Sequence, residues 1–396
     1  MPDRPEDGPA SRNSHDGFAD LARACTDGRL TRRELLARAA VLGLSGSALG
    51  ALLAACGGSS EPKAAPVAMD TTLPQQITLY NWEFYSSPKA LKGFEKLHGV
   101  KVVEKTFGSQ DELYKVMQKD SGAFDVIMAS DFWVKLLREG GLVQPLDMSR
   151  IPNFKYVTQP VFRKPSFDPE ADGKKYSVPY MFGSVGFAVR LDKIHDPLPK
   201  WDILYDPAYK QQLSMLDGSR EVLGPALFSL GYPLNTTDQA QLDEATAKAI
   251  KQKPLVTVYD SGSMKARILE GLPLVQCWDG DAVGAMNEMG LSKIRYVLPQ
   301  EGYQIWADAV CVPTSAPSAY AAHLFLDYLL DPAVAAENAN YLGYQPVVEA
   351  ADPMIKSLVQ RAMRPTPDVI AAGTLAEDLG EFNAAYDAAY EKVTKA

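Results

Sequence analysis

Short apolar segments alternate with amphipathic segments of helical length through most of this 396-residue chain. The segment 77–82 has the β-branched and aromatic residues of a strand, and Ser87-Pro88 then opens a helix whose apolar residues share one face. The apolar run 124–129 is followed in the same way by a helix from 132 to about 139. Strands that alternate with helices of this length predict a parallel sheet with helical crossovers. The fold class is therefore α/β.

A second α/β stretch follows an irregular segment that ends in two extended pieces, 176–180 and 184–190. Its apolar periodicity predicts helices and strands, the helices at 220–230, 237–252, 263–270 and 281–289 and the strands at 274–278 and 294–298. The remainder predicts a β-rich run at 303–313 and three further helices, at 319–330, at 332–341 and in the tail. The pattern indicates two α/β units. The second begins near residue 182, and the run at 303–313 can belong to either.

The first residues have the features of an export signal rather than of a fold. Adjacent arginines at 32–33 precede an uncharged apolar run, 39–55, which is shorter than the ~20 residues of a membrane span. The run ends in Leu-Ala-Ala directly before Cys56, which resembles a bacterial lipobox. We expect a twin-arginine lipoprotein signal peptide at 1–55, and a lipid-carrying Cys56 with a flexible tether at 56–76. The protein is then exported and anchored to the outer face of the cell membrane, because more than one acyl chain gives stable anchoring.

The charge of the chain restricts its partners. The formal net charge at pH 7 is −9, and residues 1–55 contain seven arginines and seven acidic residues, so the negative charge belongs to the rest of the chain. An acidic surface argues against nucleic acid and favours cationic partners. The histidines after residue 76, His98, His195 and His323, fit no metal spacing, and no nucleophile-elbow or phosphate-loop motif follows residue 76. We expect no metal, no cofactor and no catalytic residue.

Two cysteines, Cys277 and Cys311, lie in the part of the chain that is expected to fold. Two cysteines do not make a disulfide framework, so they either pair outside the membrane or are separate small hydrophobic residues. Both lie within apolar runs. This context favours two buried thiols.

Aromatic and acidic residues coincide at two strands. The run 274–278 ends in a tryptophan that Asp279 and Asp281 follow, and Trp306 and Asp308 alternate along a second predicted strand. Ligands of open α/β sheets bind outside the carboxyl ends of strands, where an aromatic face and a carboxylate both attract an ammonium group. A buried carboxylate beside an indole is costly without a partner, so a ligand cation accounts better for Trp306 and Asp308. Asp279 is expected to be solvated.

Five stretches, in order, resemble one family, the spermidine/putrescine-binding proteins of ABC importers. They are Leu79-Tyr80-Asn81-Trp82, the run from Phe124 to Ser130, the run from Tyr176 to Tyr180, Arg220-Glu221-Val222, and Pro299-Gln300-Glu301-Gly302 leading to Trp306-Ala307-Asp308. The resemblance implies a two-lobed periplasmic-binding-protein fold of type II, in which two crossing hinge strands near residues 180 and 304 flank a ligand cleft. It implies a first lobe of 77–181 plus 304–350 and a second lobe of 182–303 plus 351–396.

The resemblance also implies the ligand residues. They are Trp82, Tyr85, Ser130, Glu221, Trp278, Asp281, Trp306 and Asp308. In the family, aromatic rings sandwich the methylene chain of a polyamine and carboxylates bind its terminal amines. The expected function is therefore that of a monomeric solute-binding lipoprotein, not an enzyme, which captures a putrescine- or spermidine-like cation and delivers it to a membrane permease.

Two departures from the family pattern leave alternatives open. Phe84 stands where the first loop of the family has an acid, with Glu83 one residue early, and Gly218 follows Asp217 where paired acids are usual. Adjacent side chains on an extended segment face opposite ways, so Glu83 is not expected to replace the missing acid. The ligand can then be another amine or a zwitterion. A different class, a cell-surface hydrolase, would use Asp281 and Asp308 as an acid/base pair.

Overall fold

The computed structural model describes residues 69–170, 173–195, 197 and 199–396. The predicted signal peptide, Cys56 and most of the tether lie outside these residues. The described part, Met69–Ala396, is one compact unit by its internal contacts.

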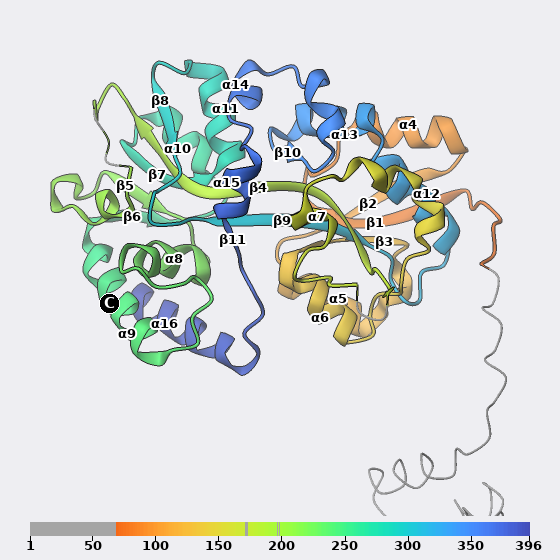
Figure 1. Ribbon diagram of the computed structural model, residues 1–396, viewed down its shortest axis with the longest axis horizontal. Coiled ribbons are helices and arrows are strands. Elements are labelled where there is room, and N and C mark those ends of the chain that lie inside the picture. The colour runs from red at the N-terminus through yellow and green to blue at the C-terminus, as the bar shows by residue number, and fades with distance from the viewer. Residues whose placement is uncertain (1–68, 171–172, 196, 198) are drawn as a thin grey trace, which may run out of the picture. The chain divides into compact units, whose positions relative to one another are not determined.

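The core of the fold is one mixed sheet. Its strands in chain order are β1 (Gln76–Trp82), β2 (Lys101–Phe107), β3 (Val126–Ser130), β4 (Ser177–Arg190), β5 (Leu213–Met215), β6 (Val256–Tyr259), β7 (Leu274–Trp278), β8 (Ile294–Val297) and β9 (Gln304–Cys311). Their order across the sheet is β2-β1-β3-β9-β4-β7-β5-β6, and β8 pairs with β4. The strands β1 to β3 are parallel to one another, as are β5 to β7. The predicted parallel sheet is therefore present twice, once on each side of β4 and β9 (Figure 1).

The two central strands join the halves of the sheet. β4 and β9 pair antiparallel from Ser177 opposite Cys311 to Val185 opposite Gln304. All fourteen residues of β4 are buried, so the two extended pieces expected from the sequence form a single strand. Pro179 cannot donate a backbone hydrogen bond, and the pairing register shifts directly after it. The two crossing strands expected from the family resemblance are confirmed.

Helices cover both faces of the sheet. They are α4 (Pro88–His98), α5 (Gln110–Asp120), α6 (Asp131–Glu139), α7 (Pro160–Arg163), α8 (Ser219–Ser229), α9 (Gln239–Gln252), α10 (Met264–Glu270), α11 (Asp279–Met289), α12 (Ala319–Leu329), α13 (Pro332–Leu342), α14 (Leu358–Ala362), α15 (Pro367–Ala372) and α16 (Asn383–Lys395). Figure 1 shows α4 and α13 on one face and α5 and α6 on the other, and in the second half α10 and α11 lie opposite α8 and α16. The α/β class with layered helices is confirmed.

The tail forms a further connection between the halves. After β10 (Gln345–Pro346), which pairs with β4, the chain passes through α14 and α15 to β11 (Thr374–Leu375), which pairs with β9. It ends in α16, which packs on α8 and α9. The lobe boundaries expected from the sequence stay a prediction.

An arginine ties the tail to the start of α8. The guanidinium of Arg220 lies 3.9 Å from the centre of the Tyr386 ring and donates hydrogen bonds to the Leu234 carbonyl and the Asn383 side chain. The Tyr386 hydroxyl donates to the same Leu234 carbonyl at 2.8 Å. The last helix thereby fixes the first turn of α8, which contains Glu221.

The two cysteines are free and fully buried. Burial raises the pKa of both Cys277 and Cys311 well above the usual thiol range, so both stay protonated and unreactive. The expectation of two buried thiols is confirmed.

Replacing Tyr386 with Phe should lower the free energy of unfolding by about 1–3 kcal/mol, because the buried Leu234 and Thr236 carbonyls lose a shared donor. Urea unfolding measures this change. Tyr390→Phe is the matched control on the same helix, since its hydroxyl forms no hydrogen bond within the part of the chain that the structure describes. It should change the free energy by less than about 0.5 kcal/mol. Equal losses from both variants would contradict the role given to Tyr386.

Candidate functional site

Asp308 lies at the centre of a hydrogen-bonded group that joins three separate segments. Its side chain is 6% exposed. The Tyr85 hydroxyl donates to one carboxylate oxygen at 2.6 Å, and the Ser130 hydroxyl donates to the other at 2.5 Å. Burial raises the pKa of Asp308, and the two hydroxyl donors oppose that rise. The structure thus brings together three of the predicted site residues.

Ser130 has a different role from the one that its position suggests. It precedes α6, where a serine usually caps the helix, but its side chain makes no capping hydrogen bond. The register of the sheet places it opposite Asp308, and its hydroxyl accepts a hydrogen bond from Gln110 while donating to Asp308. The hydroxyl therefore orients the buried carboxylate.

Aromatic rings pack together beside Asp308. The Trp306 and Tyr344 rings meet edge to face with centroids 4.9 Å apart, and the Tyr85 ring lies 6.2 Å from that of Tyr344. Tyr180 packs 5.8 Å from Tyr85 on its other side. Trp306 and Asp308 thus reach the same group of rings, as their alternation along the strand predicts. Tyr344 and Tyr180 were not among the predicted site residues, because no acid stands beside them in their own segments.

Glu221 is linked to the same strand from the other half of the sheet. Its carboxylate accepts a hydrogen bond from the side chain of Gln304 at 3.1 Å. It folds back over Gly218, at the N-cap of α8, where any Cβ would collide with it. Burial raises the pKa of Glu221, and the donors around it oppose the rise. The glycine that stands where a second acid was expected makes room for Glu221.

The expectation that Asp279 is solvated is wrong. Asp279 is 5% exposed, and its carboxylate lies against Gly183 of β4, where a Cβ would clash with both Asp279 and Trp306. Burial raises its pKa to about 7. The side chain reaches this position because Gly183 leaves the crossing strand open, a contact between distant segments that local sequence does not reveal.

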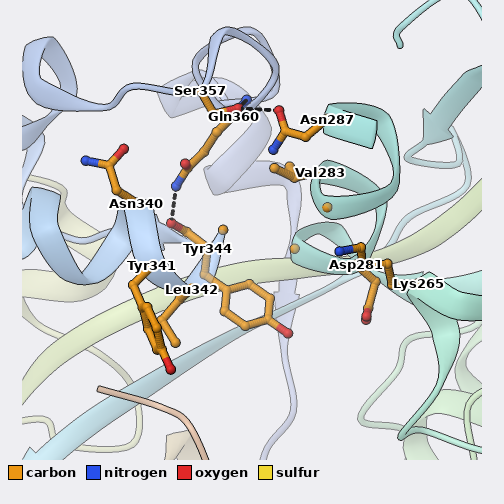
Figure 2. Close-up of a pocket in the computed structure, with 13 residues that line it drawn as sticks. Lys265, Asp281, Val283, Asn287, Asn340, Tyr341, Leu342, Tyr344, Ser357 and Gln360 are labelled. Carbon is orange, nitrogen blue, oxygen red and sulfur yellow. Dashed lines mark hydrogen bonds between the residues drawn. The ribbon is translucent and has the colours of Figure 1, made fainter. Parts of the chain in front are cut away.

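Asp281 lies apart from the hydrogen bonds of Asp308. It lines a pocket of about 270 Å³ between α11 and the segment from Asn340 to Tyr344. Figure 2 shows Asp281 with Lys265 on one side of this pocket and the ring of Tyr344 on the other. Burial raises the pKa of Asp281 to about 6, while the backbone N–H and the charge of Lys265 oppose the rise.

The two other tryptophans that were predicted as site residues lie at strand ends. Trp82 is partly buried, and its ring lies 4.5 Å from that of Phe107 at the carboxyl ends of β1 and β2. Trp278 ends β7 opposite Val185, and like Trp306 it packs against the apolar cluster of the second half. Phe84 is 73% exposed with a positive φ of 57°, so it does not enter the group around Asp308.

A further carboxylate, Asp131, was missed by the sequence analysis as a site residue. It is the first residue of α6 and is 5% exposed. Burial raises its pKa to about 8, and the negative charges of Asp308 and Glu221 add to the rise. An acid directly after the end of a parallel strand is the sequence signal that could have identified it, but helix starts favour acids for structural reasons too.

Among the described residues, no helix is long and apolar enough to cross a membrane. Within the same residues, no three or more His, Cys, Asp or Glu side chains come together as a group that could hold a metal ion.

Comparison with known proteins gives consistent results. A family model described as "Bacterial extracellular solute-binding protein" matches residues 89–363. The spermidine/putrescine-binding periplasmic protein of Salmonella typhimurium is 33% identical over 80% of this chain and 91% of its own length. The putrescine/agmatine-binding protein of Pseudomonas aeruginosa is 30% identical over 74% of this chain and 83% of its own. A putative spermidine/putrescine ABC transporter structure from Listeria monocytogenes superimposes with a TM-score of 0.74 at 30% identity, covering 81% of this chain and 99% of that one.

The buried carboxylates should make the ligand-free protein less stable as the pH rises. Asp131 and Asp279 have raised folded-state pKa values of about 8 and about 7, so the folded state binds protons more tightly than the unfolded state. Between about pH 7 and 8.5, above the range in which histidines titrate, their ionisation should cost about 1–2 kcal/mol of folding free energy. Urea unfolding at several pH values measures the slope. Asp131→Asn should reduce it, and an unchanged slope would contradict the assignment.

Proposed function

We propose, from the premise that this chain belongs to the bacterial extracellular solute-binding proteins and to their spermidine/putrescine-binding members, that it captures a linear polyamine between its lobes. The family resemblance seen in the sequence is confirmed by the matches over most of the chain. These relatives are the solute-binding proteins of ABC importers. Solute-binding proteins of this family are not enzymes. The observation that carries the proposal is the buried carboxylate of Asp308, held by two hydroxyl groups beside aromatic rings.

The geometry of β9 supports an elongated ligand. Gln304, Trp306 and Asp308 alternate along the strand and so project from one face. Asp308 stands at one end of this row, and Glu221 binds Gln304 at the other. Four residues of strand rise about 13 Å, which separates the two carboxylates along the row and places an indole between them. Ammonium groups at the ends of a methylene chain match this arrangement.

Each candidate side chain has a proposed role. The carboxylates of Asp308 and Glu221 bind ammonium groups, and the ring of Trp306, with that of Tyr344, contacts the methylene chain. Tyr85 and Ser130 orient Asp308. The other predicted residues, Trp82, Trp278 and Asp281, lie at the edges of the site, with Asp281 in the pocket of Figure 2.

Closure of the two lobes about β4 and β9 would trap the solute. Lys135 of α6 forms an ion pair at 3.1 Å with Asp378, which lies between β11 and α16. This contact joins one segment from each of the proposed lobes, 77–181 plus 304–350 and 182–303 plus 351–396. We further propose that the protein acts as a monomer, exported by the twin-arginine route and anchored through acylated Cys56, and that it delivers the solute to a membrane permease.

One observation favours the alternative in which the ligand also carries a hydrogen-bond acceptor. The indole nitrogen of Trp306 is buried and donates no hydrogen bond within the described residues. An ammonium group cannot accept from it, whereas a carboxylate or hydroxyl group can. A zwitterionic amine is therefore the second candidate solute. The hydrolase alternative has no such support, because Asp281 lines a pocket whose lining residues do not include Asp308.

Isothermal titration calorimetry should detect binding of spermidine or putrescine with a dissociation constant of about 1 μM or below, which corresponds to about −8 kcal/mol. Asp308→Asn should weaken binding by about 10- to 100-fold, because a charge-assisted hydrogen bond contributes about 1.5–3 kcal/mol. Asp111→Asn removes the same charge from an exposed position and should leave the affinity unchanged. If the wild-type protein binds neither amine, the proposal is contradicted.

The affinity for a polyamine should fall as the pH is lowered. Asp131 and Asp279 are buried carboxylates near the proposed ligand groups, and their pKa values are raised to about 8 and about 7. Protonation of these two groups removes negative charge that attracts the cation. Between about pH 8 and pH 6 the dissociation constant should rise at least tenfold at constant ionic strength, because both groups become protonated in that interval. A dissociation constant that stays the same over this range would argue against an electrostatic contribution of these two carboxylates to binding.

A further inference from the structure

We propose that Gln304 is an additional ligand residue and that, together with Glu221, it makes one end of the site select an ammonium group over a guanidinium group. The inference rests on the proposed polyamine function and assigns a specificity-determining residue within it. The hydrogen bond between the two side chains, the place of Gln304 on β9 and the contacts that hold Glu221 support it.

The amide group of Gln304 has a defined orientation. Its Nε2 atom donates a hydrogen bond to Oε1 of Glu221 at 3.1 Å. Because an ionised carboxylate only accepts hydrogen bonds, the amide turns its NH₂ group toward Glu221 and its oxygen away. Gln304 is 7% exposed, and its amide oxygen accepts no hydrogen bond within the described residues, yet it is not among the fully buried atoms that lack a partner. A small molecule can therefore reach this unused acceptor.

The strand β9 places the acceptor in the row of proposed ligand groups. Gln304 and Trp306 are two residues apart, so their side chains project from the same face. The backbone at Gln304 is paired on both sides, with Val185 of β4 and with Thr374 of β11. The side chain thus starts from a fixed backbone. Its amide lies between the carboxylate of Glu221, which it contacts, and the next residue of the row, Trp306.

Glu221 is held at its backbone and at its side chain. Gln276 is fully buried, donates to the backbone carbonyl of Glu221 at 2.7 Å and accepts from the backbone N–H of Leu216 at 3.1 Å. Oε1 of the carboxylate accepts from Gln304, and Oε2 lies over Gly218, where an added Cβ would collide with it. Each of the two oxygens is therefore in contact with a different neighbour.

The adjacent cation of the protein points away from Glu221. The guanidinium of Arg220 stacks on the Tyr386 ring at 3.9 Å. It donates hydrogen bonds to the carbonyls of Leu234 and Glu377. Arg220 therefore offsets the charge of Glu221 only through space, and an ammonium group of a ligand can supply the direct contact.

The geometry of this pair favours one kind of cation. An ammonium group has three N–H donors and can donate to the Glu221 carboxylate and to the Gln304 amide oxygen at the same time. A guanidinium group is planar and binds a carboxylate best through two parallel N–H bonds, one to each oxygen. Since Gln304 and Gly218 each lie against one of these oxygens, that paired approach is obstructed. Amines that end in ammonium groups should therefore bind more tightly than analogues that end in guanidinium groups.

Titration calorimetry of the full-length chain tests this with putrescine, spermidine and the diguanidine analogue of putrescine, in which guanidinium groups replace both ammonium groups. The wild-type protein should bind at least one of the two amines about tenfold or more tightly than the diguanidine. Gln304→Met keeps the length of the side chain and removes the amide. It should weaken binding of that amine by at least about tenfold, the loss expected for one hydrogen bond to a charged group, and binding of the diguanidine by less than about threefold.

Two further variants separate this role from a structural one. Gln118→Met makes the same exchange at an exposed position of α5 and should change neither affinity. In a Glu221→Gln background, Gln304→Met should weaken the amine by less than about threefold, because the carboxylate no longer orients the amide. A structural effect would instead give the same loss in both backgrounds.

Two results would overturn the role of Gln304 and leave the proposed function intact. One is equal weakening of the amine and the diguanidine by Gln304→Met, and the other is a wild-type protein that binds the diguanidine as tightly as the amine. Failure of the wild-type protein to bind either putrescine or spermidine would instead reject the proposed function.

Discussion

The antiparallel pairing of β4 with β9 is the interaction on which the rest of the structure depends. It joins the two parallel halves of the sheet, and it runs from Ser177 opposite Cys311 to Val185 opposite Gln304. The same pairing fixes which residues of β9 face the site. Gln304, Trp306 and Asp308 share one face because the strand is regular over this length. A break in that regularity would move the indole and the carboxylate to opposite sides.

The elements of the fold could be predicted from local sequence because their signals are local. Ser87 accepts a hydrogen bond from the backbone of Lys89 at the start of α4, and Gly99 ends that helix with a left-handed conformation. The separation of 176–180 from 184–190 was wrong, because pairing with β9 from Ser177 to Val185 continues the strand through Gly183, where the local strand propensity is weak. The direction of the central strands is likewise a property of the complete sheet.

The site was predictable where two chemical features occur on one strand. Trp306 and Asp308 are two residues apart, so period-two geometry alone places them together. The sequence could not identify Asp131, Asp279 and Tyr344 as site residues in the same way. Their burial results from contacts with segments far away in the chain. Asp279 was expected to be solvated, yet the absence of a side chain at Gly183 lets it approach the crossing strand. Local sequence describes Asp131 and Asp279 only as helix starts.

The hydrogen bond between Tyr85 and Asp308 joins residues 223 positions apart. Tyr85 follows β1 and Asp308 lies in β9, and the parallel strands of the second half, β5 to β7, are encoded between them. During synthesis, strands β1 to β3 therefore lack their neighbouring strand β9 until strands β5 to β7 have left the ribosome. Long-range pairings of this kind slow folding, because a large loop must close before the contact forms. The edge of β3 is the surface left open during that interval, which makes it the segment most exposed to mispairing with another chain.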